Sequence, residues 1–273
     1  MLFDTHCHLN FSEFQKERLN ILKQCRKEKI NLIIVGIDIK SSRRAVDLAE
    51  NNLGAWATIG LHPLYLKKIN RQEILTLSEL AKMEKVVAIG EVGLDYHHFD
   101  SRESRKSLEQ KIVRQKKFLS EMIKIANENN LPVIFHSWGS DKEIEGIIGK
   151  RNSYSDILEL IENQPVKKKG IVHSFIGSYK TAKQFTEKGF FIGLNGIITY
   201  SDSYDRLIKE VGLENIVLET DAPYLTPRPF NKNQKNTPCN VKTVARKIAQ
   251  VLKVNIKTVY RKTFLNAKKI FSI

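Results

Sequence analysis

The stretch Ile30-Asn31-Leu32-Ile33-Ile34-Val35-Gly36 decides the fold. It is a nearly unbroken run of aliphatic side chains, many of them β-branched, which indicates a strand buried on both faces in a parallel sheet. Other short apolar runs are also predicted to be strands, and segments with helical periodicity separate them. The eight predicted strands are one that begins at Leu2, then residues 30–36, 55–60, 86–90, 132–136, 169–173, 189–195 and 215–221.

Helices are predicted between these strands, at residues 11–29, 41–52, 74–83, 102–129, 179–188 and 204–211, and again from residue 241 onward. Parallel neighbouring strands need helical crossovers, so this order predicts a (β/α)8 TIM barrel, an α/β fold. The alternative is an open doubly wound sheet, which calls for a glycine-rich phosphate loop near the first strand. The sequence has no such loop there. The 273 residues suit a single domain that covers residues 1–273.

The composition narrows the class of protein. Lysine and arginine outnumber the acidic residues 45 to 30, and the net charge of +15 favours polyanionic partners, although a coding bias toward lysine, asparagine and isoleucine could also produce it. Three widely spaced cysteines, Cys7, Cys25 and Cys239, suit a reducing cytoplasm. Asp4 interrupts any signal peptide, and no apolar run approaches the roughly 20 residues that span a bilayer. We therefore expect a cytoplasmic protein that does not enter a membrane, and a monomer, since nothing demands an oligomer.

The segment Asp4-Thr5-His6-Cys7-His8-Leu9 follows the start of the first predicted strand. Alternate side chains of a strand share a face, so His6 and His8 point the same way as Asp4, and Cys7 points the other way. Two imidazoles on one face can bind one metal ion, although such a pair can equally lie on the surface or form hydrogen bonds. The positions of the other histidines favour the metal.

Polar side chains at the carboxyl ends of barrel strands meet at one rim, where the active site lies. Five of the seven histidines lie at predicted strand ends, and the other two, His97 and His98, follow the segment Gly90-Glu91-Val92-Gly93-Leu94-Asp95-Tyr96, which is predicted to be a loop. The residues predicted at the rim are His6 and His8 from the first strand, His62 from the third, Glu91 from the fourth, His136 from the fifth, His173 from the sixth and Asp221 from the eighth.

This set of side chains suits divalent metal chemistry. Imidazole and carboxylate ligands suit Zn²⁺, Mn²⁺ or Fe²⁺, and Mg²⁺ where waters complete the shell. Four histidines and two acids are enough for two ions, with Glu91 as a natural bridge. Two ions about 3.5–4 Å apart can share a hydroxide and stabilise the attacking and leaving oxygens. Asp221 could bind one ion and also accept the proton of the attacking water as general base.

In this order, the motifs resemble those of the TatD family of metal-dependent deoxyribonucleases, part of the wider amidohydrolase-like barrel superfamily. The resemblance extends from Phe3 to about Phe271. The segments that carry it are Asp4-Thr5-His6-Cys7-His8-Leu9, Gly60-Leu61-His62-Pro63, Gly90-Glu91-Val92-Gly93-Leu94-Asp95-Tyr96, Pro132-Val133-Ile134-Phe135-His136-Ser137, His173-Ser174-Phe175-Ile176-Gly177, Glu219-Thr220-Asp221-Ala222-Pro223-Tyr224-Leu225, Asn236-Thr237-Pro238 and Asn266-Ala267.

The resemblance implies two metal sites that share one carboxylate. The implied ligands are His6, His8, Glu91 and Asp221 for one ion and Glu91, His136 and His173 for the other. It also implies that His62 contacts a substrate phosphate, so that Asp221, Glu91 and His62 are the expected catalytic residues. The implied ion is Mg²⁺, with Mn²⁺ or Zn²⁺ as alternatives. The implied reaction is hydrolysis of phosphodiester bonds from the 3′ end of single-stranded DNA, with RNA as an alternative partner, by water that two metals activate.

Three positions depart from the family pattern. Two residues after the fifth-strand histidine the family often has arginine, but this chain has Trp138, which could stack on a base or pack at the base of the loop. Residues 139–154 lengthen the connection to the sixth strand and could form a lid, a substrate-shaping loop or an insertion. Near the C-terminus, Gln234 and Lys235 stand where the family often has arginine before its Asn-x-Pro element.

Three functions remain open from the sequence. The first is a two-metal nuclease, the second a barrel hydrolase of an amide, lactone or aminoacyl ester, and the third a non-catalytic nucleic-acid-binding protein that a metal stabilises. In the wider superfamily a carboxylated lysine often bridges the metals at the end of the fourth strand, so Glu91 at that place favours the nuclease. The presence of every expected ligand disfavours the non-catalytic protein.

Overall fold

A computed structural model of the chain describes residues 1–66, 70–140 and 142–273. Its eight strands form one parallel sheet, in which each strand pairs with the next one along the chain. The strands are β1 (Leu2–Cys7), β2 (Ile30–Val35), β3 (Ala55–Ile59), β4 (Val86–Asp95), β5 (Val133–Trp138), β6 (Ile171–Val172), β7 (Phe191–Leu194) and β8 (Ile216–Leu218).

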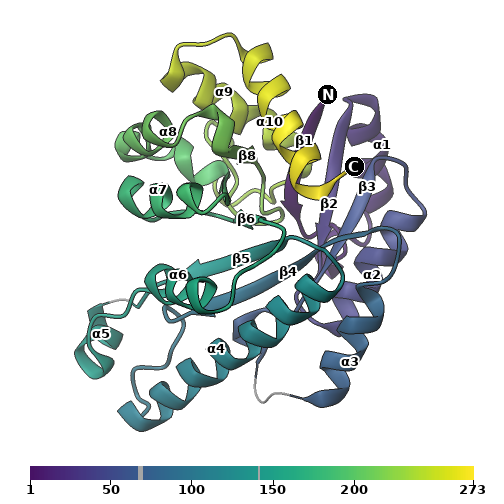
Figure 1. Cartoon of the computed structure of the whole chain (residues 1–273). Coiled ribbons are helices and arrows are strands. Elements are labelled where there is room, and N and C mark those ends of the chain that lie inside the picture. Colours follow the sequence, from purple (N-terminus) through teal and green to yellow (C-terminus); the bar gives the residue numbers. More distant parts are fainter. Residues whose placement is uncertain (67–69, 141) are drawn as a thin grey trace.

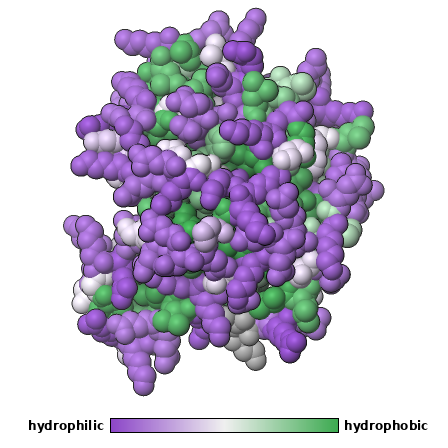
Figure 2. Space-filling view, in the orientation of Figure 1, coloured by the Kyte–Doolittle hydropathy of each residue, from purple (hydrophilic) through white to green (hydrophobic). Residues whose placement is uncertain are grey.

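Helices surround the strands (Figure 1), and the face of the molecule in Figure 2 is mostly hydrophilic. No described helix is long and apolar enough to cross a membrane. The α-helices of the described residues are α1 (Arg18–Lys27), α2 (Ile39–Glu50), α3 (Arg71–Leu80), α4 (Arg105–Glu128), α5 (Lys142–Ile148), α6 (Ser153–Asn163), α7 (Tyr179–Glu187), α8 (Asp205–Val211), α9 (Val241–Leu252) and α10 (Ile256–Phe271).

The ring of strands is completed by contacts between the ends of β1 and β8 rather than by a regular ladder. One parallel bridge joins Cys7 to Ala222. The N–H of His8 donates to the carbonyl of Ala222 (2.8 Å), and the N–H of Asp221 donates to the carbonyl of His6 (2.9 Å). The predicted (β/α)8 barrel is therefore confirmed, and its closure draws the two ends of the strand order together.

The strands are apolar on both faces, as the run in β2 predicts. Leu32 and Ile34 belong to the large core between the strands and the helices, whereas Ile33 and Val35 belong to a smaller core inside the barrel. Phe3 of β1 stacks on Phe264 of α10 with 5.3 Å between the ring centroids. This helix covers the end of the barrel where the strands begin, next to the N-terminus (Figure 1). The polar residues gather at the opposite end.

The first helix is shorter than the predicted span of residues 11–29. Ser12–Phe14 form a 3-10 turn, and α1 begins only at Arg18. The side chain of Arg18 donates back to two carbonyl groups of the preceding loop, which holds that loop outside the helix. From this start the helical register turns Ile21 and Leu22 inward. The spacing of Phe14, Leu19, Leu22 and Cys25 predicts an apolar face for this helix, but Leu19 is 68% exposed.

The fourth strand continues past the predicted end at residue 90. β4 runs to Asp95, because Val92 and Leu94 are buried and pair with Phe135 and Ser137 of β5. The segment that the sequence predicted to be a loop is therefore strand, and it carries Asp95 to the rim of the barrel.

Other boundaries differ by a few residues. β6 keeps only Ile171–Val172 of the predicted residues 169–173. α3 begins at Arg71 rather than at residue 74, because Asn70 caps it by accepting the N–H of Gln72 (2.9 Å). Residues 139–154 contain α5 and the start of α6, and α5 lies at the periphery of the molecule (Figure 1). Residue 141 of that segment lies outside the described residues.

β6 approaches β5 so closely at Gly170 that a β-carbon there would overlap the carbonyl oxygen of Val133. We expect Gly170→Ala to lower the free energy of unfolding by about 1–3 kcal/mol, which urea denaturation would measure. Gly146 in α5 provides the matched control, because nothing lies within 4 Å of a β-carbon at that position. Alanine should stabilise that helix slightly. Equal stability of the two variants would contradict the close contact.

Candidate metal centre

The structure brings together the residues that the sequence placed at the rim. His6 lies in β1, Glu91 in β4 and His136 in β5, whereas His8, His62, His173 and Asp221 lie in the loops directly after β1, β3, β6 and β8. All but His136 and Asp221 are buried, and these two are half-buried. Their donor atoms form several overlapping groups in which every atom lies within 4.8 Å of the others. The groups are His6, His8 and Glu91; His6, His173 and Asp221; Glu91, His136 and His173; and His62, Asp95 and His136.

Glu91 stands between two sets of imidazoles. Its Oε2 atom lies 3.3 Å from Nε2 of His6 and 3.8 Å from Nε2 of His8. Its Oε1 atom lies 2.8 Å from Nε2 of His173 and 2.9 Å from Nδ1 of His136. Each carboxylate oxygen therefore faces one of the two predicted ligand groups, which is the arrangement that a bridging carboxylate needs.

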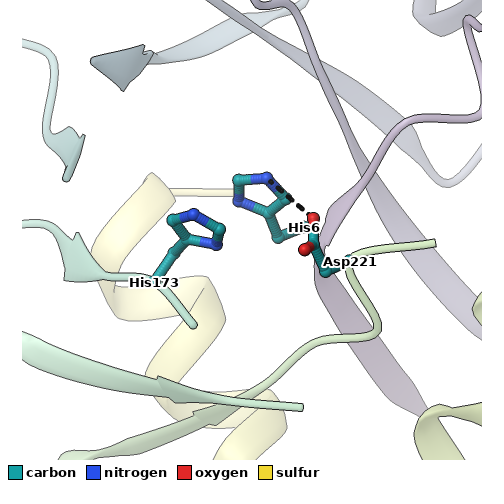
Figure 3. Close-up of side chains that lie close together, drawn as sticks. All are labelled: His6, His173 and Asp221. Carbon is teal, nitrogen blue, oxygen red and sulfur yellow. Dashed lines mark ion pairs between the residues drawn. The ribbon is translucent and has the colours of Figure 1, made fainter. Parts of the chain in front are cut away.

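Asp221 completes the first group from the other side of the barrel closure. Its Oδ1 atom lies 3.3 Å from Nε2 of His8 and 3.7 Å from Nε2 of His6. Figure 3 shows this carboxylate beside His6, whose ring stacks on that of His173 with 3.9 Å between the centroids. The backbone of Asp221 has a positive φ of 54°, a conformation that Asp and Asn adopt more readily than most residues.

A buried carboxylate beneath the centre holds β1 against the segment after β8. Asp4 is fully buried and accepts the N–H of His6 (3.2 Å), the N–H of Thr220 (2.9 Å) and the Thr220 hydroxyl (2.5 Å). Asn236 donates to the carbonyls of Thr220 (2.9 Å) and Tyr224 (2.7 Å) and so fixes the same loop from outside. These bonds position the backbone on both sides of Asp221.

Hydrogen bonds at the far nitrogen of two histidines indicate which nitrogen of each ring carries a proton. Nδ1 of His8 lies 3.2 Å from the carbonyl of Val35, so this nitrogen donates and Nε2 presents a lone pair to the cavity. Nδ1 of His62 instead accepts the N–H of Leu64 (3.2 Å), so in the neutral ring the proton belongs on Nε2. His8 therefore presents a lone pair to the cavity, whereas His62 presents a hydrogen-bond donor.

Two acidic residues of the site carried no assigned role in the sequence analysis. Asp95 is fully buried, and its Oδ2 atom lies 2.9 Å from Nε2 of His136. Glu219 lies 3.7 Å from Nδ1 of His173 and accepts the N–H of Ser174 (2.6 Å). Both are placed to orient a histidine of the predicted ligand set. Both lie two or four positions from a predicted ligand along the chain, so alternation along an extended segment could have found them.

The electrostatics of the cluster favour a bound cation. Burial opposes ionisation of Glu91, but the surrounding imidazoles, His173 foremost, outweigh it and lower the pKa of Glu91 well below its ordinary value. Burial likewise opposes charge on His136, but the carboxylates of Asp95 and Glu91 raise its pKa to about 8. Glu91 also raises the pKa of His173, against the effect of burial. Without a metal, the carboxylates are thus ionised and draw protons onto two imidazoles.

The donor set fits divalent ions. Ligands about 2.0–2.1 Å from a tetrahedral ion lie about 3.3 Å from one another. Nε2 of His6 lies at that distance from Nε2 of His8 and from Oε2 of Glu91. Among the described residues, Nδ1 of His6 and both ring nitrogens of His173 are buried without a hydrogen-bond partner. Buried ring nitrogens without a hydrogen-bond partner are what a bound ion would satisfy.

A cavity of about 340 Å³ opens above this cluster at the carboxyl ends of the strands. Its floor is formed by the histidines and acids, and apolar and aromatic side chains form its walls. Walls and upper rim include Phe11, Ile37, Leu64, Tyr65, Trp138, Ile176, Ile197, Tyr224 and Leu225. No described residue of segment 139–154 lines the cavity, although Oγ of Ser153 lies 2.8 Å from Oγ of Ser137, which does line it.

A (β/α)8 barrel with a buried imidazole–carboxylate cluster at its rim defines a metal-dependent hydrolase of the barrel class. The family model described as TatD related DNase matches residues 3–272, and the chain belongs to that family. The resemblance inferred from the motifs is thereby confirmed.

Several relatives agree in length and fold. The chain is 31% identical to the uncharacterized metal-dependent hydrolase YabD of Bacillus subtilis (strain 168), over 100% of both chains. It is 27% identical to the 3′-5′ ssDNA/RNA exonuclease TatD of Cronobacter sakazakii, over 91% of this chain and 89% of that one. The crystal structure of YjjV, a TatD homologue from Escherichia coli K12, superimposes with a TM-score of 0.85 at 27% identity and covers 100% of this chain and 98% of that one.

Because Nδ1 donates in His8 and accepts in His62, alanine variants of these two residues should differ in metal content. We expect His8→Ala to lose bound metal, because it removes a lone pair that faces the carboxylates. We expect His62→Ala to keep its metal, because Nε2 of that ring is a donor. Metal analysis after dialysis against a limiting concentration of Mn²⁺ would measure both. Metal loss in the His62 variant would move this residue into the ligand set.

Proposed function

We propose that the protein is a divalent-metal-dependent nuclease that removes nucleotides from the 3′ end of single-stranded DNA, with RNA as an alternative substrate. The observation that carries this proposal is Glu91, whose two oxygens face two separate groups of imidazoles. The name of the relative from Cronobacter sakazakii supports the substrate class. We propose two ions, Mg²⁺ in the first place and Mn²⁺ or Zn²⁺ as alternatives.

The proposed ligands form the two groups expected from the sequence. They are His6, His8, Glu91 and Asp221 for one ion and Glu91, His136 and His173 for the other. Divalent ions bound there would supply Lewis-acid stabilisation of negative charge on the phosphate and would lower the pKa of water.

Asp221 is the proposed general base. Burial works against its ionisation, but His8 and His6 lower its pKa below the ordinary value, so it is a carboxylate at neutral pH. Its side chain is 15% exposed, more than that of Glu91, and it lines the cavity. An attacking water in the cavity can therefore pass its proton to this carboxylate.

His62 is the proposed phosphate contact. Its Nε2 atom lies 3.4 Å from Oε1 of Glu91, on the cavity side of the ring, and carries a proton in the neutral state. Burial, together with His136, lowers the pKa of His62, so that the ring is neutral at pH 7. The N–H can donate to a phosphate oxygen that lies next to the metal groups.

The shape of the rim supports a single strand as the substrate. The metal groups lie at the floor of a cavity, so a scissile phosphate must reach down between its walls. A second hollow beside the cavity shares Phe11, Ile37, Tyr65 and Tyr224 with it. Its other lining residues include the cations Lys40 and Arg44 and the acids Glu13 and Asp38. A flexible strand could continue from the cavity into this hollow, with its phosphates near the two cations.

The rival function is hydrolysis of another bond, such as an amide, a lactone or an aminoacyl ester. The discriminating experiment is a time course on a 3′-labelled single-stranded oligonucleotide, with Mg²⁺, Mn²⁺ or Zn²⁺ and with a chelator. We expect the labelled 3′-terminal nucleotide to be released first, and the chelator to abolish this release. Turnover of the other ester and amide substrates by the same metal-loaded sample, without shortening of the oligonucleotide, would favour the rival.

Asp221→Asn tests the proposed base. We expect the variant to lose at least about 100-fold in kcat, because the amide cannot accept the proton. The fold should be preserved, because Asn also tolerates the positive φ at this position. Oligonucleotide hydrolysis, with circular dichroism and DNA binding as controls, would measure these effects. Near-normal turnover would show that another group is the base.

Metal binding should release protons at neutral pH. The pKa of His136 is about 8 in the absence of metal, so this ring is mostly protonated at pH 7 and must lose its proton to act as a ligand. The apparent affinity for metal should therefore rise as the pH rises through 8. Calorimetric titrations of Mn²⁺ in two buffers with different ionisation enthalpies would measure the released protons. Heats that do not depend on the buffer would contradict this protonation state.

A further inference from the structure

Three aromatic rings outside the proposed ligand set pack together, and we call them the Trp138 cluster: His97, His98 and Trp138. His98 and Trp138 line the cavity. Trp138 ends β5, two residues after His136, and is 37% exposed. Its ring lies parallel to that of His97, with 4.3 Å between the centroids and 3° between the planes. The ring of His98 is perpendicular to both and lies 5.0 Å from each of their centroids.

No other described ring lies on the indole face opposite His97, and the indole is partly exposed where it lines the cavity. A ring on the face of Trp138 opposite His97 would lie much farther from His97 than from Trp138. His98 is equally distant from both, so it stands beside the stack rather than on that face. Within the described part of the chain, the indole N–H has no hydrogen-bond partner, and no other ring stacks on the indole.

The Trp138 cluster is held in place from below. The N–H of His98 donates to Oδ1 of Asp95 (3.1 Å), and Nδ1 of the same ring lies 3.0 Å from Oδ2. The same Oδ2 atom contacts Nε2 of His136, so one carboxylate connects the cluster to a proposed ligand. The N–H of Tyr96 donates to the carbonyl of Trp138 (2.8 Å). Because these rings are already ordered, little conformational entropy is lost when a substrate binds to them.

The exposed side chains that line the cavity are aromatic rather than cationic. Among the described residues, four tyrosine, tryptophan or phenylalanine side chains are exposed, namely Tyr65, Trp138, Tyr224 and Phe230. The first three line the cavity. No described lining residue is lysine or arginine, although the chain has 45 of them. Exposed rings concentrated in this way indicate a ligand with flat apolar groups.

We propose that Trp138 is the surface on which the nucleobase of the 3′-terminal nucleotide stacks, completing a stack of His97, Trp138 and base beside the metal centre. The proposal rests on the proposed function and deepens it. The protein selects its substrate end by the base, and not by a cationic clamp on the phosphate. Stacking tolerates any of the bases, since each has an aromatic face, and favours the larger purines.

A comparison of two oligonucleotides tests this role. One ends in a normal purine nucleotide, and the other is identical except that its 3′-terminal residue is a tetrahydrofuran without a base. We expect the wild-type protein to remove the purine nucleotide with a kcat/KM at least about fivefold higher, the lower limit for one stacked base. Trp138→Ala should bring the ratio near one, and Trp138→Phe should keep part of it, because phenylalanine retains a ring.

The ratio of the two rates is an internal measure that does not depend on how much of a variant is correctly folded. Trp56→Phe is the matched control. Trp56 packs against Phe3, in the apolar core that α10 covers at the opposite end of the barrel. This substitution should leave the ratio unchanged. Equal removal of both ends by the wild-type protein, or a ratio that survives in Trp138→Ala, would overturn the stacking role.

A binding measurement separates this inference from the proposed function. Trp56 and Trp138 are the two tryptophans of the chain, so Trp56→Phe leaves Trp138 as the reporter. In that background, with Asp221→Asn to prevent turnover and Mg²⁺ present, the purine-ended oligonucleotide should quench the fluorescence, and the tetrahydrofuran-ended one should quench it much less. Quenching without hydrolysis by the Asp221-containing protein would refute the nuclease and retain the stacking site. Hydrolysis with equal quenching by both ends, or with none, would refute the stacking site and retain the nuclease.

Discussion

The buried carboxylate of Glu91 is the contact on which the rest of the site depends. It is 3% exposed, and five imidazoles from four strands or their loops lie within 3.8 Å of its two oxygens. Imidazoles packed so closely would repel one another if they were protonated, and a lone carboxylate would be costly to bury. The carboxylate reduces the repulsion between the imidazoles, and the imidazoles stabilise the buried carboxylate. Divalent ions would interact favourably with both. The site is therefore a preformed cluster whose ionised carboxylates favour the binding of cations.

The closure of the barrel makes this cluster possible. β1 and β8 are the first and last strands, and they meet through a bridge and through the hydrogen bonds that Asp4 accepts from Thr220. That junction places the backbone and the carboxylate of Asp221 next to His6. At the other end of the barrel, α10 packs apolar side chains against the starts of the strands. The apolar packing of α10 and the imidazole–carboxylate cluster therefore lie at opposite ends of the same barrel.

Family membership and the chain's own residues answer different questions. The family model and the similar relatives establish a metal-dependent hydrolase. The choice of substrate depends on the walls of the cavity, which this chain lines with tyrosine and tryptophan rather than with arginine. Trp138 stands where the family often has a residue that can pair with phosphate. At this position the chain therefore offers an aromatic ring to a base instead of a charge to a phosphate.

Local sequence determined the barrel. Short apolar runs such as residues 30–36 indicate strands that are buried on both faces, and the helical segments between them indicate the crossovers. It also determined which polar residue types follow each strand, so His6, Glu91, His136 and Asp221 could be expected at one rim. Only the tertiary structure decided that β4 runs on to Asp95, that Glu219 lies behind His173 and that Leu19 faces solvent. The physical reason is that strand pairing, helix register and distances between side chains depend on neighbours that lie far away along the chain.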